Sequence, residues 1–293
     1  MKRVMSKLSD YRFNRAGNWR LVTLPDQWSG ELQSRVLEMV RAEARARHPS
    51  TVEITSKMDG GDSHLYLKIF HRAKGIPALK DLIRQSKALH FWRQSVLLAE
   101  NGFNVPPVVA AGEQRRFRVV RRAFVVTERV DGQGIPVFLS ARAACGPDRK
   151  IMALKRDGLK RFADLVRRFH QCGFVHGDLV ASNILVSETP LDGLKLYFMD
   201  NDRTRRYPFW FPQSLWKRNL VQLNRMPLPG ISLQDRMRFL HAYLDKRKFS
   251  SADRRLAQWL EVKTRRRRKE CDGVDPSVNF RRLMRWLPEP QRR

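Results

Sequence analysis

Apolar residues in the first 130 positions follow the two spacings that distinguish strands from helices. Short apolar runs bounded by turn-forming residues predict strands at 52–55, 65–70, 105–110 and 118–127. Apolar residues three and four positions apart predict helices at 31–47 and 79–97. The second helix is expected to stop at Asn101 and Gly102, because glycine accepts the left-handed conformation that ends a helix. This part of the chain is predicted to form a sheet with a long helix packed on it.

Helical spacing dominates beyond a break at 131–134. A stripe of apolar residues from Leu159 to His170 predicts a helix that ends at Gly173. Apolar runs at 184–186 and 194–199 are separated by a turn at 190–193, and from Gln213 onward helices dominate, including Leu233 to Leu244. We place a boundary at the break, between an N-terminal lobe with an N-terminal extension (residues 1–130) and a mainly helical C-terminal lobe (residues 131–293).

Length and composition exclude several classes of protein. A chain of 293 residues with 42% hydrophobic residues has ample material for one large domain or two lobes, and it is neither disordered nor collagenous. No run approaches the ~18 apolar residues of a membrane-spanning helix. The basic N-terminus lacks the apolar core of a signal peptide, and the 3 cysteines lack the spacing of a disulfide framework or a zinc site. We therefore expect a protein of the reducing cytoplasm.

The net charge of the chain indicates a class of binding partner, namely anionic molecules. The chain has 58 Lys and Arg against 29 Asp and Glu, a formal charge of +29, which attracts nucleic acid, an anionic membrane or a phosphorylated substrate alike. Many of these residues are also ordinary solvated surface. The basic tract 263–269 fits either a solvated helix face or contact with an anionic bilayer, with nearby aromatic residues as anchors or as core. Those aromatic residues are Trp210, Phe211, Trp216 and Trp259.

The strongest chemical signal is the segment 174–186, which reads FVHGDLVASNILV. Asp178 stands two residues after His176, Asn183 follows five residues later, and an apolar strand comes next, as in the catalytic loop of phosphotransferases. Phosphoryl transfer needs a carboxylate that accepts the proton of the attacking hydroxyl and an amide oxygen that holds magnesium on the phosphates. Asp178 and Asn183 supply these two groups. His176 is expected to be buried and to shape the backbone of the loop.

Two further residues complete the pattern. Asp200 follows an apolar strand 17 residues after Asn183, which is where a second magnesium ligand is expected, although the Phe-Gly of the kinase Asp-Phe-Gly motif is absent. Lys68 lies on a strand that follows the Gly60-Gly61 turn, as expected if the turn covers nucleotide phosphates and the lysine reaches them. Taken alone, Lys68 would be an ordinary exposed charge, but its order before the loop favours a phosphate ligand.

These motifs resemble the bacterial lipopolysaccharide core kinases, which phosphorylate heptose or 3-deoxy-D-manno-octulosonic acid (Kdo). The resemblance runs from about Leu65 to Arg268, and the Asp-Asn-Asp-Arg segment at 200–203 and the Arg-Phe-Leu-x-Ala-Tyr-Leu segment at 238–244 make it more specific than the loop alone. The other matching segments are 65–68, 102–107, 127–130 and 176–179 with Asn183.

The resemblance implies an α+β, two-lobed protein-kinase-like fold, with a small antiparallel sheet and one long helix in the N-lobe and a mainly helical C-lobe. It also implies ATP and Mg²⁺ as cofactors. The site residues that it implies are the catalytic base Asp178, the magnesium ligands Asn183 and Asp200, and the nucleotide-binding residues Lys68, Gly60, Gly61 and Glu128, the last beside the adenine hinge.

The sequence departs from the kinase pattern at two places. Gly177 replaces the Arg of regulated protein kinases, which favours a constitutively active small-molecule kinase. The long helix has no acid near Trp92 to pair with Lys68, and Glu100, near the helix end, is the nearest later candidate. Asp202 is either an accessory site residue or a structural partner of a neighbouring arginine.

The sequence thus predicts an ATP-dependent kinase that phosphorylates a sugar hydroxyl of the lipopolysaccharide inner core. We expect it to be peripheral on the cytoplasmic face of the inner membrane, with the lipopolysaccharide core and lipid A as acceptor and the anionic bilayer as partner. No nucleic-acid motif appears, and no protein partner is indicated. The alternatives are a kinase of another small molecule, although cationic acceptors would be repelled by the charge of +29, and an inactive relative that binds membrane or nucleic acid. The presence of Asp178, Asn183 and Asp200 argues against inactivity.

Overall fold

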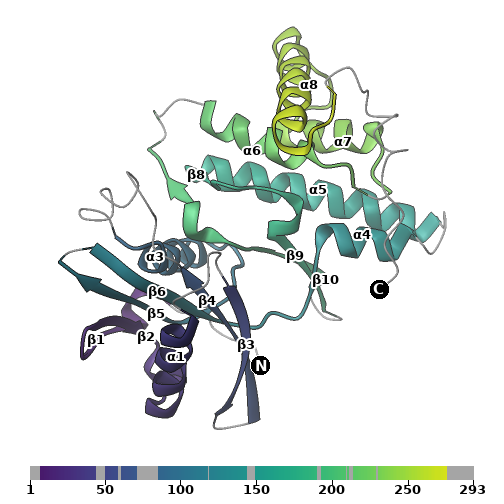
Figure 1. Ribbon diagram of the computed structural model, residues 1–293. Helices are drawn as coiled ribbons and strands as arrows, with labels where there is room; N and C mark the ends of the chain where they lie inside the picture. The colour runs from purple at the N-terminus through teal and green to yellow at the C-terminus, as the bar shows by residue number, and fades with distance from the viewer. Residues whose placement is uncertain are drawn as a thin grey trace. The chain divides into compact units, whose positions relative to one another are not determined.

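The chain folds into two compact units, which the computed structural model in Figure 1 shows by element. The first unit comprises Met1–Asp131 and Tyr197–Thr204, and the second comprises Gly132–Leu196 and Arg205–Arg293. The structure describes residues 7–43, 50–58, 61–70, 85–117, 119–143, 149–189, 193–208, 210, 214–228 and 230–275. Parts of the predicted helices at 31–47 and 79–97 and of the predicted turn at 190–193 lie outside these residues.

An antiparallel sheet of six strands forms the first unit, in the order β1-β2-β5-β6-β4-β3. The strands are β1 (Arg12–Ala16), β2 (Trp19–Thr23), β3 (Ser50–Met58), β4 (Gly61–Phe70), β5 (Val108–Arg116) and β6 (Val119–Glu128). β3 and β4 contain the predicted strands 52–55 and 65–70, β5 begins three residues later than the predicted strand 105–110, and β6 matches 119–127 of the fourth. β1 and β2 were not predicted, because the exposed edge strand β1 has no apolar alternation. Trp19 and Leu21 of β2 are nonetheless buried in the core.

Each face of this sheet is covered by one helix (Figure 1). Phe124 and Val126 pack with α1 (Gly30–Ala42), and the alternating residues Ala123 and Val125 pack with α3 (Lys87–Glu100), as the period of two along a strand requires. Both helices begin at a serine whose hydroxyl accepts a backbone N–H of the first turn. The helix predicted at 79–97 begins at Lys87, after its N-cap Ser86, and ends at Glu100, two residues before Gly102, whose φ is positive.

The second unit is mainly helical. Its helices are α4 (Ile135–Ala143), α5 (Arg149–Gln171), α6 (Ser214–Arg225), α7 (Leu233–Leu244) and α8 (Ser251–Asp272), and its short strands are β7 (Gln133–Gly134), β8 (Phe174–Val175), β9 (Ile184–Thr189), β10 (Gly193–Phe198) and β11 (Arg205–Arg206). α5 carries the predicted stripe, with Ala163, Val166 and Phe169 fully buried. It ends before Gly173, whose φ is +83°, and a Cβ at this position would collide with the carbonyl oxygen of Tyr207.

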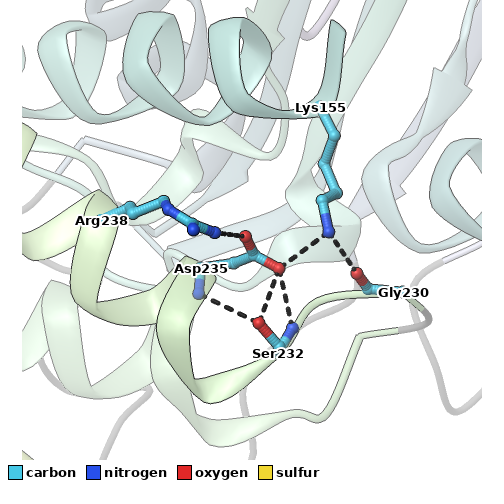
Figure 2. A network of polar contacts seen from close by, with 5 residues as sticks. All are labelled: Lys155, Gly230, Ser232, Asp235 and Arg238. Atoms are coloured by element: carbon cyan, nitrogen blue, oxygen red, sulfur yellow. Dashed lines mark hydrogen bonds and ion pairs between the residues drawn. The ribbon is translucent and has the colours of Figure 1, made fainter. Parts of the chain in front are cut away.

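A buried acid joins α5 to the start of α7 (Figure 2). The carboxylate of Asp235 accepts hydrogen bonds from Lys155 Nζ at 2.9 Å, from the backbone N–H of Ser232 at 3.0 Å and from Arg238 Nη1 at 2.8 Å. Lys155 also donates to the carbonyl oxygen of Gly230 at 3.1 Å. Burial alone raises the pKa of Asp235, but the hydrogen bonds from Lys155 and Ser232 outweigh it and lower the pKa to about 2.

Among the described residues, no helix combines the length and the apolar character that crossing a bilayer would need.

Candidate active site

Lys68 lies near the C-terminal end of β4, on the face of the sheet that α3 covers. The neighbouring residues Leu67 and Ile69 belong to the core beneath α1, so Lys68 points to the opposite side. Its Nζ lies 2.6 Å from Oδ1 of Asp200, from the segment 197–204 that joins the first unit. The structure therefore brings together two of the predicted site residues that stand 132 positions apart in the sequence.

Asp200 is the acid that pairs with Lys68, a question that the sequence left open. Glu100, the nearest acid on α3, accepts a hydrogen bond from the backbone N–H of Leu8 at 3.0 Å instead. The side chain of Asp200 is 50% exposed and that of Lys68 is 19% exposed, so the pair lies at the surface of the unit and its carboxylate is accessible. Asp200 has φ +53° and ψ +50°, the left-handed conformation, which Asp tolerates better than most residues.

The remaining predicted nucleotide-binding residues that the structure describes, Glu128 and Gly61, lie on β6 and on β4. Gly61 begins this strand and pairs with Met58 of β3, whereas Gly60 lies outside the described residues. Glu128 ends β6 and is opposite Leu65 of β4. Its buried carboxylate accepts a hydrogen bond from Gln27 Nε2 at 2.7 Å, so this side chain is engaged within the first unit.

The predicted catalytic loop at 174–186, in the second unit, is held by hydrogen bonds within itself. His176 is fully buried, and its Nδ1 accepts the backbone N–H of Asp178 at 3.2 Å, which confirms that it shapes the loop. Asn183 Nδ2 donates to the carbonyl oxygen of Asp178 at 2.9 Å, so the amide of Asn183 is oriented by the residue that carries the predicted catalytic carboxylate. The structure therefore holds Asp178 and Asn183 together in one short loop.

Two residues of α6 hold this loop, and sequence reasoning missed both. The carboxamide of Asn219 accepts the backbone N–H of His176 at 3.0 Å and donates to the carbonyl oxygen of the same residue. Gln222, three residues later on the same helix face, accepts from the backbone N–H of Leu179 at 3.1 Å and donates to the carbonyl oxygen of Gly177 at 3.1 Å. The backbone of the loop is thus fixed on both sides of Asp178, and no local signal around 174–186 could have found these partners.

The family can now be assigned. The sequence profile of the lipopolysaccharide kinase (Kdo/WaaP) family matches residues 31–243, well over half of the chain. The chain belongs to this kinase family.

This Kdo/WaaP family member is also similar to solved structures and to a curated protein. A structure of WaaP in complex with acyl carrier protein aligns with a TM-score of 0.56 and 22% identity, over 78% of this chain and 91% of that chain. This likeness shows the predicted two-lobed protein-kinase-like fold. The kinase domain of Mycobacterium tuberculosis PknI, solved as a double mutant, aligns with a TM-score of 0.39 and 13% identity, over 72% and 90% of the two chains.

The curated relative is the EKC/KEOPS complex subunit bud32 of Aspergillus fumigatus, which is 29% identical over 154 residues. The match covers 43% of this chain and 55% of the relative, so the chain spans about half the length of that protein.

The family is one of ATP-dependent kinases, and the residues of this member suit the magnesium ion that commonly accompanies ATP. The carboxylate of Asp200 and the amide oxygen of Asn183 are hard oxygen ligands, which Mg²⁺ prefers. The accessible carboxylate of Asp200 and the oriented amide of Asn183 fit this role chemically.

The residues of the basic tract 263–269 in this Kdo/WaaP family member have different surroundings. Arg268 is buried, and it donates to the carbonyl oxygens of Arg225 at 2.6 Å and Asn224 at 2.9 Å, which closes the C-terminal end of α6. Arg267 donates to Glu270 at 3.1 Å; this bond is the main cause that raises the pKa of Arg267, and the charge of Asp178 adds to it. The tract is therefore a helix in which Thr264 and Arg268 are buried and the other residues are half-buried or exposed.

A large apolar cavity of about 1160 Å³ lies within the second unit. Its lining includes Leu159, Phe162, Leu220, Ile231, Leu240 and Leu260, from α5 to α8. Four cationic side chains contribute to the same lining: Lys155, Arg161, Arg236 and Arg265. Three of these cations pair with an acid: Lys155 with Asp235, Arg161 with Asp157, and Arg265 with Glu261, which also lines the cavity.

Proposed function

We propose that this kinase transfers the γ-phosphoryl group of ATP to a sugar hydroxyl of the lipopolysaccharide inner core, on heptose or Kdo. The observation that carries the proposal is the loop of Asp178 and Asn183, fixed by α6, in a chain of the Kdo/WaaP family. The same loop argues against an inactive relative, because an unused carboxylate would not need hydrogen bonds on both sides of its backbone.

The proposed roles follow from the chemistry of each group. Asp178 accepts the proton of the acceptor hydroxyl as the acceptor oxygen bonds to the γ-phosphorus, the bond from that phosphorus to the bridging oxygen breaks, and ADP leaves. Lys68 offsets charge on the ATP phosphates, beneath the turn that contains Gly60 and Gly61. Glu128 ends the strand beside which the adenine would lie.

Magnesium would be held by Asn183 and Asp200 and would supply charge neutralisation at the phosphate oxygens. The contact of Lys68 with Asp200 then keeps an ammonium group next to the metal carboxylate before nucleotide binds. In this arrangement Lys68 would bind the anionic phosphates and Asp200 would bind the metal cation.

Charge supports an anionic acceptor. The chain carries +29, and the charge of Asp178 is the last of several causes that raise the pKa of Arg267. An acceptor with phosphate or carboxylate groups would be attracted to this region, whereas an aminoglycoside or a choline-like compound would be repelled. This favours an acidic saccharide over the alternative small-molecule acceptors.

Association with the anionic inner membrane is part of the proposal, and α8 offers the surface for it. The buried face of this helix contains Asp253, Leu260, Thr264 and Arg268. At 100° per residue, the opposite face consists of Arg255, Trp259, Val262, Arg266 and Lys269, which we name the α8 outer face. Val262 is 65% exposed and Trp259 is 38% exposed between these cations. An amphipathic pattern of this kind suits the interface of an anionic bilayer.

The catalytic proposal is tested by magnesium-dependent ATP turnover with and without isolated core lipopolysaccharide. Asp178→Asn keeps the size of the side chain but cannot accept the proton, so we expect acceptor-stimulated turnover to fall by roughly 10²- to 10⁴-fold. The matched control is Asp157→Asn, which removes an exposed acid of the same unit that pairs with Arg161, and it should retain most activity. Equal turnover in the wild type and Asp178→Asn would refute the assignment.

The membrane proposal is tested by retention on phosphatidylglycerol vesicles, phosphatidylcholine vesicles and duplex DNA at matched salt. Val262→Asp should weaken retention on the anionic vesicles alone. Phe117→Asp, at an 82% exposed apolar residue of the first unit, is the matched control and should retain binding. Stronger retention on DNA than on anionic vesicles, or equal loss in both variants, would contradict this part of the proposal.

A further inference from the structure

Asp200 is accessible, but the residues around it are buried. Phe198, Asn201 and Thr204 have no exposed surface. Phe198 packs against Phe103 at 6.0 Å between ring centroids, and its backbone N–H donates to the carbonyl oxygen of Asn104 at 2.9 Å. The carboxylate is therefore presented from a short segment that is anchored before and after it.

The anchor after Asp200 is a set of hydrogen bonds to α3. Asn201 Nδ2 donates to Ser95 Oγ at 3.3 Å and to the carbonyl oxygen of Phe198 at 3.2 Å. Thr204 Oγ1 donates to Asn201 Oδ1 at 3.4 Å, and the carbonyl oxygen of Thr204 accepts from His90 Nε2 at 2.8 Å. Because a carbonyl oxygen only accepts, His90 carries its proton on Nε2 in this contact.

This linkage differs from an ion pair between α3 and Lys68. The sequence of α3 contains one acid, Glu100, and that acid bonds to the backbone of Leu8. Lys68 bonds to Asp200 itself. The contacts from α3 reach Asp200 through its neighbours Asn201 and Thr204.

We propose that Ser95 and His90 of α3 are positioning residues, which set the place of the Asp200 carboxylate through Asn201 and Thr204. The left-handed backbone of a non-glycine residue costs of order 1–3 kcal/mol and persists only where surrounding contacts hold it. The hydrogen bonds of Asn201 and Thr204 are such contacts, on the residues that follow Asp200. A movement of α3 would therefore displace the carboxylate, so the helix controls the metal ligand without an acid of its own.

This inference rests on the proposed role of Asp200 as a magnesium ligand, and metal binding is its direct readout. The experiment measures Mn²⁺ binding by calorimetry in the presence of ADP, for Ser95→Ala, His90→Leu and the wild type. Each lost hydrogen bond should weaken metal binding by roughly three- to tenfold. His90→Gln retains an N–H donor at a similar distance from the backbone and should restore most of the affinity.

Thr23→Val is the control, because it removes a side-chain hydrogen bond of the buried Thr23 in the same unit, the bond from the exposed Asn14 Nδ2 to Thr23 Oγ1 at 3.2 Å. It should lower the thermal midpoint and leave Mn²⁺ binding unchanged. Unchanged metal affinity in Ser95→Ala and His90→Leu, or equal weakening in Thr23→Val, would overturn the positioning role.

The failure of the proposed function gives a different result. A wild-type protein that binds Mn²⁺ with ADP but phosphorylates no acceptor contradicts the catalytic proposal and leaves the positioning measurement valid. A wild-type protein that binds no metal removes the role of Asp200, and the positioning role with it.

Discussion

Replacing Asp235 by Asn should destabilise the second unit strongly, because it removes the carboxylate that joins α5 to α7 (Figure 2). Asp235 is 1% exposed, and its partner Lys155 is 17% exposed. Removing one member of a buried ion pair costs about 3–5 kcal/mol, since the other charge loses its compensation. The remaining exposure of Lys155 places the expected loss near the lower end, at about 3 kcal/mol.

The pH dependence of unfolding isolates the contribution of this carboxylate. The pKa of Asp235 is about 2 in the folded protein and 3.8 ordinarily. A group whose pKa is lowered by folding contributes stability above its unfolded pKa, and the contribution is lost as the pH falls from about 4 through 2. This difference in pKa corresponds to roughly 2 kcal/mol. The Asn variant should lack this part of the acid dependence.

The assay is urea unfolding, followed by tryptophan fluorescence at neutral pH and at several pH values between 2 and 5. Asp253→Asn is the matched control, because Asp253 forms the same capping box at the start of α8 but pairs with Lys246, which is 47% exposed. Its loss of stability should be smaller. Equal losses in the two variants, or unchanged acid dependence in Asp235→Asn, would refute the reasoning.

Three further predictions concern the site and its supports. Lys68→Met should raise the KM for ATP about tenfold or more, because a charged hydrogen bond to phosphate is lost; an unchanged KM in steady-state kinetics would contradict the phosphate contact. Gly173→Ala should destabilise the protein by at least about 1 kcal/mol, because its φ is positive and the new Cβ meets the carbonyl of Tyr207; a thermal midpoint equal to that of the wild type would count against this. Asn219→Ala should lower kcat by more than the loss of folded protein explains, since it frees the backbone of the predicted catalytic loop. A kcat that falls only in proportion to the folded fraction at 25 °C would indicate a structural role alone.

The local motifs of this protein could be predicted from the sequence, because their geometry depends on short spacing. Asp178 and Asn183 are five residues apart in one loop, and the bond between them follows from that spacing. Most helices and the strands β3 to β6 also follow from apolar periodicity. The glycines just after two helix ends, Gly102 and Gly173, could be predicted because glycine accepts the left-handed conformation that stops a helix. Both take positive φ in the structure.

The partners of the site residues could not be predicted, because they come from distant parts of the chain. Asp200 reaches Lys68 across 132 positions, and Asn219 reaches His176 across 43. Neither contact leaves a local pattern. Arg268 shows the same limit within one tract, since five consecutive basic residues look alike in sequence, yet this one is buried against the end of α6.

The central claim is tested most directly by following the γ-phosphoryl group itself. ATP labelled at the γ-phosphate is incubated with the wild-type protein and core lipopolysaccharide, and the saccharide is isolated and examined by mass spectrometry and ³¹P NMR. The account predicts a labelled phosphate monoester on a heptose or Kdo hydroxyl, absent with Asp178→Asn. Label found only as inorganic phosphate or on protein, with an unmodified saccharide, would contradict it.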